Sequence, residues 1–230
     1  MKKFKKLIPA FCMLLISAML MGTSTYAWFS MNKTVTATGM ELKAKSDSIY
    51  LVINAGAEFD KANTSATATS QIDAAKALYP VAPVETLTSA TVATPGAWHY
   101  TYSDANDNHE KGADKAYTVC TGDNFANYVA SESFFVGLNE KSGAAEAANL
   151  KVTAVKLPEN TGISVVIVCG EKAFTYTADV NSGTEVIADT VTDAGVEVKV
   201  YYFINGEDEH VYSNGADLLK GTVTLTFDVD

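Results

Sequence analysis

The stretch Val196-Glu-Val-Lys-Val-Tyr-Tyr-Phe-Ile204 decides the fold class of this chain. It begins by alternating valine with charged residues and continues as an aromatic and aliphatic run, which is the pattern of a strand that packs against a core. Asn205-Gly206 comes directly after it, and this dipeptide is the strongest short signal for a hairpin turn. We therefore expect a strand over residues 196–204 that turns into a second extended segment over Glu207–Tyr212.

Several other segments share this strand pattern, with β-branched and aromatic residues bounded by Gly, Asn, Asp or Pro. They are Thr34–Ala44, Ser48–Ile53, Tyr128–Leu138, Leu150–Leu157, Ile163–Cys169, Ala173–Thr177 and Thr222–Val229. No long amphipathic helix and no repeat of fixed period accompanies them. The pattern predicts a mainly β chain whose body is a β-sandwich or a jelly roll.

The segment from about residue 60 to 125 differs in composition from the strand-like segments. Asn63–Ser70 is of low complexity, Ile72–Leu78 has the composition of a short helix, and three prolines come next at Pro80, Pro83 and Pro95. We interpret residues 60–125 as an elaborated, irregular insertion in the sandwich.

The first 27 residues have the layout of a secretion signal. Lys2, Lys3, Lys5 and Lys6 precede the apolar stretch Leu7–Met21, and small or polar residues lead to Thr25-Tyr-Ala27. This order predicts an apolar signal helix over residues 1–27 that is cut between Ala27 and Trp28, leaving one domain over residues 28–230. The alternative is an anchor that stays in the membrane, because a span needs about 17–25 residues.

Charge narrows the class of partner. The chain carries -10, and the leader contributes four lysines and no acid, so residues 28–230 carry -14. Such a surface disfavours nucleic acid. The chain also has no arginine, so it cannot build bidentate clamps on carboxylate or phosphate groups, which makes anionic small-molecule substrates less suitable.

Two cysteines, Cys120 and Cys169, lie beyond the leader. Outside the cell a disulfide between them would persist. The alternative is that both are small buried hydrophobic residues, because Cys169 ends an apolar run.

Residues with catalytic or metal-binding chemistry are sparse. His99, His109 and His210 are far apart and form no zinc-binding helix motif, so we expect no catalytic residue, no metal and no cofactor. Asp104–Lys115 begins like a calcium loop but lacks its glycine and its closing glutamate, and the acids Glu207–Glu209 fit a solvated turn. Leu157-Pro-Glu-Asn-Thr-Gly162 resembles a wall-sorting signal with one residue too many, and it lies inside the chain.

The junction Gly22-Thr-Ser-Thr-Tyr-Ala-Trp-Phe-Ser-Met-Asn32, together with Thr34-Val-Thr-Ala-Thr-Gly-Met-Glu-Leu42, resembles the TasA and camelysin type of exported Gram-positive protein. The segments Val198–Asp208 and Thr222–Phe227 resemble the closing strands of that family. The resemblance implies a dedicated signal peptidase, a jelly-roll body, and self-assembly into a homopolymer of the biofilm matrix or cell surface. It does not extend over the region from about residue 60 to 125.

The resemblance also implies that an N-terminal strand of one subunit completes the sheet of the next, and residues 28–44 are the candidate donor. Val35, Ala37, Met40 and Leu42 are the side chains that would fill pockets, with a β-bulge at Gly39 bringing them to one face. The alternative is that this strand pairs within its own domain.

We therefore expect a secreted, non-enzymatic protein of the extracellular cell surface that meets the membrane only through its leader before cleavage. Three alternatives stay open. One is a tethered, pilin-like protein; another is a surface adhesin whose Trp98, Tyr100 and Tyr102 contact a ligand unless they belong to the core. The third, a metalloprotease as associated with camelysins, lacks the ligand spacing in this chain.

Overall fold

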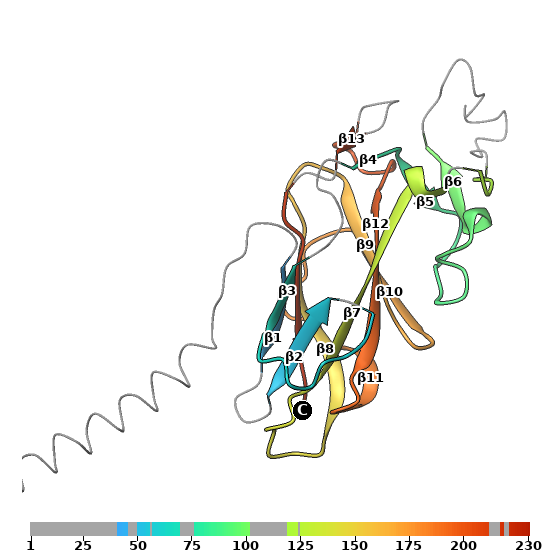
Figure 1. The fold of residues 1–230 in the computed structure, drawn as a ribbon. Coiled ribbons are helices and arrows are strands. Elements are labelled where there is room, and N and C mark those ends of the chain that lie inside the picture. The colour runs from blue at the N-terminus through green and yellow to red at the C-terminus, as the bar shows by residue number, and fades with distance from the viewer. Residues whose placement is uncertain are drawn as a thin grey trace, which may run out of the picture. The chain divides into compact units, whose positions relative to one another are not determined.

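The computed structural model describes residues 41–45, 50–55, 57–69, 76–101, 119–123, 125–211, 217–218 and 221–230. The chain separates into two units, Met1–Thr36 and Ala37–Asp230, and all described residues belong to the second. Figure 1 shows this unit as a stack of strands with no long helix among the coloured segments.

Two five-stranded sheets form a sandwich-like body. The first sheet has the order β11-β8-β14-β1-β3 and consists of Glu185–Thr192, Glu146–Lys156, Thr224–Asp228, Glu41–Lys45 and Thr67–Thr69. The second sheet has the order β10-β9-β12-β7-β2 and consists of Lys172–Tyr176, Ile163–Cys169, Val196–Ile204, Val129–Leu138 and Leu51–Ala55. Neighbouring strands are antiparallel in both sheets except β1 and β14, which run parallel. The chain is therefore mainly β, as predicted.

Strand β12 lies in the middle of the second sheet, between β9 and β7. Its even-numbered residues from Val198 to Ile204 face the core between the sheets, while Tyr201 and Phe203 face the other side. At the start of the strand, valine alternates with charged residues because only one face of the strand is buried there. At its end, the residues are aromatic or aliphatic on both faces because both faces pack against a core. The prediction of a strand over 196–204 is confirmed.

Strand β9 is buried at every position from Ile163 to Cys169. Ile163, Val165, Ile167 and Cys169 belong to the core between the sheets, whereas Val166 and Val168 belong to a second core on the outer face. This second core is closed by β5 (Val81–Pro83), β6 (Trp98–Tyr100) and the residues around Tyr128. The sandwich thus carries a third layer on one sheet, visible beside β9 and β12 in Figure 1.

The insertion differs from the sequence-based expectation. Thr67–Thr69, within the low-complexity stretch, form β3 of the first sheet, so the insertion begins after residue 69 rather than at 60. Ala77–Leu78 form the short strand β4, which pairs with β13 (Asp217–Leu218), rather than the end of a helix. Two 3-10 turns, Pro95–Ala97 and Phe125–Asn127, complete the described part. The described residues of the insertion are therefore a layer with a core, not an irregular loop.

The turn at Asn205-Gly206 is confirmed, but the hairpin is wrong. Asn205 donates its N–H to the carbonyl of Gly162 at 2.8 Å, Gly206 donates to that of Val81 at 3.1 Å, and residues 207–211 continue as turns. A hairpin partner would have to lie beside β12, where β7 and β9 already occupy both sides. The turn therefore ties the third layer to the sheet.

The other predicted strands in the second half appear as β7, β8, β9, β10 and β14. Ser48–Ile53 corresponds to β2, and of Thr34–Ala44 the described part is β1, which begins at Glu41. Strand β11 was not predicted.

Candidate functional site

The candidate donor strand lies partly within the described residues. Leu42 is in β1, where it pairs with Leu225 of β14 and Ala68 of β3. The remaining positions proposed for assembly and cleavage lie outside the described residues; these are Thr25, Ala27, Trp28, Val35, Ala37, Gly39 and Met40. Residues 41–45 therefore pair within their own sheet, which is the alternative that the sequence left open for this part of the segment.

The parallel pairing fixes the end of the body at which β1 begins. Glu41 is level with Thr224 of β14, which is level with Lys156 at the end of β8. Strand β8 leads through a short loop into β9 at Ile163. We call this the Ile163 end of the sandwich, and the opposite end, where β9 stops, the Cys169 end. Strand β1 therefore begins at the Ile163 end.

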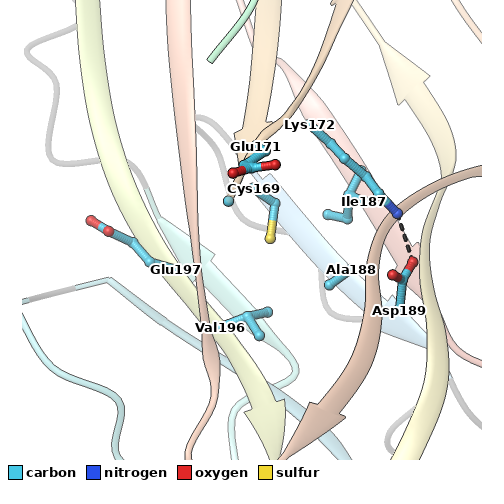
Figure 2. Close-up of a pocket in the computed structure, with 9 residues that line it drawn as sticks. Cys169, Glu171, Lys172, Ile187, Ala188, Asp189, Val196 and Glu197 are labelled. Atoms are coloured by element: carbon cyan, nitrogen blue, oxygen red, sulfur yellow. Dashed lines mark hydrogen bonds and ion pairs between the residues drawn. The ribbon is translucent and has the colours of Figure 1, made fainter. Parts of the chain in front are cut away.

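A groove opens at the Cys169 end, between the edge strands β10 and β11. It encloses about 590 Å³ and is defined by three segments, which are 169–172, 187–189 and 196–197. Figure 2 shows the Cys169 thiol pointing into the space between these segments. We call this space the edge groove.

The edge groove has an apolar floor and a charged rim. The floor consists of Ile187, which is almost fully buried, and Val196, which is partly buried. Both belong to, or pack against, the core between the sheets. Lys172 of β10 donates to Asp189 of β11 at 2.7 Å, so this ion pair spans the two sheets across the mouth of the groove (Figure 2). Glu197 also lines the site, but its carboxylate points away from the groove (Figure 2) and accepts a hydrogen bond from Ser133 of β7 at 2.8 Å.

The β-bulge in β11 shapes this site. The pairing of β11 with β8 shifts register between Val186 and Ala188, so Ile187 is the extra residue. A bulge increases the local twist and turns a side chain inward. Here Ile187 belongs to the core between the sheets and is almost fully buried.

Burial governs the chemistry of Cys169. Desolvation raises the pKa of its thiol, while nearby Lys172 lowers it and Glu197 raises it. The thiol is therefore protonated and a poor nucleophile at neutral pH.

The two cysteines do not pair. Cys120 and Cys169 are both free and buried. Cys120 lies in the second core, on the outer face of the second sheet, and Cys169 lies in the core between the two sheets. Burial raises the pKa of Cys120 to about 12. Both cysteines therefore act as small buried apolar residues, which is the alternative that the sequence left open.

The other sequence candidates lie in structural positions. Residues 157–162 form the loop between β8 and β9, where Leu157 donates its N–H to Asp179 at 2.7 Å and Gly162 has a φ of 66°, favourable for glycine. Trp98 and Tyr100 are core residues rather than a surface platform. Tyr102, His109 and the loop at 104–115 lie outside the described residues.

The acids near the Asn205-Gly206 turn contact single histidines. Glu207 lies 3.7 Å from Nε2 of His99, and Asp208 lies 2.9 Å from Nδ1 of His210. Within the described ranges, no three His, Cys, Asp or Glu residues gather in a way that could hold a metal ion. Among the same residues, no helix is long and apolar enough to cross a membrane.

No protein-family model, no curated protein and no solved structure matches this chain.

The residues of the edge groove were not singled out from the sequence. Glu185–Thr192 does carry β-branched residues, which are a weak strand signal, but nothing in it indicates that β11 ends up facing β10. The groove arises from two sheet edges that only the folded topology brings together.

Proposed function

We propose that this chain is the exported structural subunit of a cell-surface or biofilm-matrix fibre, with a jelly-roll-like β-sandwich as its body. The leader is removed, and the freed N-terminal segment of each subunit adds as a strand to the next subunit. The protein acts by assembly rather than by catalysis, and the product is a homopolymer outside the cell.

The pairing of β1 with β14 is the observation that supports this proposal most directly. All five residues of β1 pair with β14, from Glu41 with Thr224 to Lys45 with Asp228. These partners lie at opposite ends of the sequence, so no hairpin holds the two strands together. A sheet that is completed by a strand arriving from a distant part of the chain relies on main-chain hydrogen bonds, which a second copy can supply equally well.

The pairing of β1 also refines which residues would be donated. Because residues 41–45 are held in their own sheet, we assign donation to residues 28–40, with β1 as the fixed point from which they extend. This segment contains Lys33 and no acid, whereas residues 28–230 carry -14. Like-charged bodies repel one another, so added salt should speed assembly.

The test is electron microscopy of the protein recovered from the medium of a Gram-positive host, together with sequencing of its amino terminus. We expect Trp28 as the first residue and filaments whose yield rises with salt or acid. The same measurement is made on a deletion variant that lacks residues 28–40 but keeps β1. We expect this variant to stay monomeric with unchanged circular dichroism. If the deletion variant still forms filaments, strand donation by residues 28–40 is wrong. If the wild-type protein forms no filaments under any salt or acid condition, the fibre function is wrong.

A further inference from the structure

Three tyrosines pack against one another in the second core, between the third layer and the sheet. Tyr128, directly before β7, lies at their centre. Its ring centroid is 5.0 Å from that of Tyr100 in β6 and 5.6 Å from that of Tyr79, which lies between β4 and β5. The Tyr79 N–H donates to the Asn127 carbonyl at 2.8 Å, so the backbone also holds Tyr79 beside Tyr128. We call these three tyrosines the tyrosine cluster.

Packing alone does not require tyrosine at these positions. Phenylalanine fills almost the same volume and brings no hydroxyl group that needs a hydrogen-bond partner when it is buried. Tyr100 and Tyr128 are only 4% and 8% exposed, so this requirement applies to both. A phenol also differs from a phenyl ring in its chemistry, because it readily gives up one electron and one proton to an oxidant. The tyrosine cluster therefore brings oxidisable rings together.

Tyr79 is the member of the cluster that an oxidant can reach. It is only partly buried, whereas Tyr100 is buried within β6 and its hydroxyl accepts a hydrogen bond from the Thr121 N–H at 3.3 Å. The rings of Tyr79 and Tyr128 are tilted by 39°. Two phenols that are joined at their ortho carbons are likewise twisted about the new bond, so the observed tilt suits a coupling of Tyr79 with Tyr128.

We propose that Tyr79 and Tyr128 are the site of an oxidative crosslink, a dityrosine that forms within one chain when the protein meets a one-electron oxidant derived from hydrogen peroxide. Each phenol gives up one electron and one proton, and a carbon–carbon bond forms between the two ortho positions. The hydrogens on those two carbons then move to the two oxygens, which restores both aromatic rings. One hydrogen peroxide takes up the two electrons and two protons and becomes two water molecules.

The crosslink fastens the third layer to the second sheet. It closes the stretch 79–128 into a covalent loop, which contains β5, β6 and the turn at Phe125–Asn127 and ends directly before β7. A crosslink that closes a long loop stabilises the folded state mainly by restricting the unfolded chain. This stabilisation acts within each subunit and does not depend on fibre assembly.

The first experiment looks for the crosslink in the monomer. Protein recovered from the host medium is treated at low concentration and low salt with hydrogen peroxide and a haem peroxidase. Dityrosine is detected by its fluorescence and by the loss of two hydrogens from the mass of the intact chain. Trypsin cleaves after lysine and separates Tyr79, in fragment 77–111, from Tyr128, in fragment 116–141. We expect these two fragments to stay linked, with the link located at Tyr79 and Tyr128 by mass spectrometry. The absence of dityrosine, or dityrosine only between chains, refutes the proposal.

Matched variants decide which tyrosine couples with Tyr128. Tyr79→Phe and Tyr100→Phe each remove one hydroxyl from the tyrosine cluster and keep the ring, and circular dichroism checks that both proteins fold. We expect Tyr79→Phe to lose the internal dityrosine and Tyr100→Phe to keep it. Dityrosine that survives in Tyr79→Phe or disappears in Tyr100→Phe overturns the assignment.

Urea unfolding of the wild-type protein gives a readout that needs no variant. We expect the oxidised, crosslinked monomer to unfold at a urea midpoint about 1 M above that of the untreated protein. A crosslinked chain with an unchanged midpoint shows that the bond does not fasten the third layer. Because both experiments use dilute monomer, their outcome is independent of whether the protein forms filaments.

Discussion

Replacing Trp98 by alanine should remove much of the stability of the folded body. Trp98 is fully buried, its ring stacks edge-on against Phe203 of β12 with centroids 4.9 Å apart, and its Nε1 donates to the Val92 carbonyl at 3.0 Å. An indole buries about 200 Å², which at about 25 cal/mol per Å² corresponds to about 5 kcal/mol. Because large-to-alanine changes of this kind cost about 3–5 kcal/mol, we expect a loss of about 4 kcal/mol in the free energy of unfolding.

The assay is urea unfolding followed by far-ultraviolet circular dichroism. Trp98→Phe keeps the aromatic contact but leaves the Val92 carbonyl without its donor, so it should lose a smaller amount, about 1–3 kcal/mol. Val84→Ala is the control, because Val84 belongs to the same layer and is 49% exposed; it should stay within about 0.5 kcal/mol. A loss below about 1 kcal/mol for Trp98→Ala would refute the third layer as part of the cooperative core.

Three further changes test the packing and the charges. Gly137→Ala should lose about 1–3 kcal/mol in urea unfolding, because a Cβ there would lie 2.4 Å from the ring of Phe59; wild-type stability would contradict this contact. Tyr202→Phe should raise the free energy of unfolding by about 1–3 kcal/mol, because its buried hydroxyl has no hydrogen-bond partner in the described structure, and a loss of stability would mean that a partner such as water binds it. The hydrogen bond from Lys151 lowers the pKa of Asp230, so this carboxylate contributes stability above its unfolded pKa and loses it as pH falls through the lowered folded value. Asp230→Asn should therefore flatten the decline of the thermal midpoint below about pH 4, and an unchanged profile would rule out the contribution.

The class of fold could be predicted from hydrophobic periodicity because the central strands carry it strongly. The continuous apolar run Ile163–Cys169 is buried along its whole length, and the stretch 196–204 shows where one buried face gives way to two. Propensity alone placed both strands at their observed bounds. Strand β11 was missed because Ala188 and Asp189 interrupt its apolar residues, and a bulge adds a residue out of phase.

The candidate site was less accessible to sequence reasoning. Asn205-Gly206 has the local chemistry of a hairpin turn, but the neighbours of β12 leave no room beside it for a returning strand, and those neighbours are set by the whole topology. The edge groove likewise requires β10 and β11 to face one another from different sheets. Local patterns describe strands, whereas grooves are properties of strand order.

The third layer leaves a signature that can be sought in other chains. Val166, Val168, Tyr201 and Phe203 are apolar because the layer shields them from water. A relative that had lost the layer would have to exchange these residues for polar ones, so that the runs at 163–169 and 201–204 become alternating. These four positions therefore indicate from sequence alone whether a related chain has the third layer.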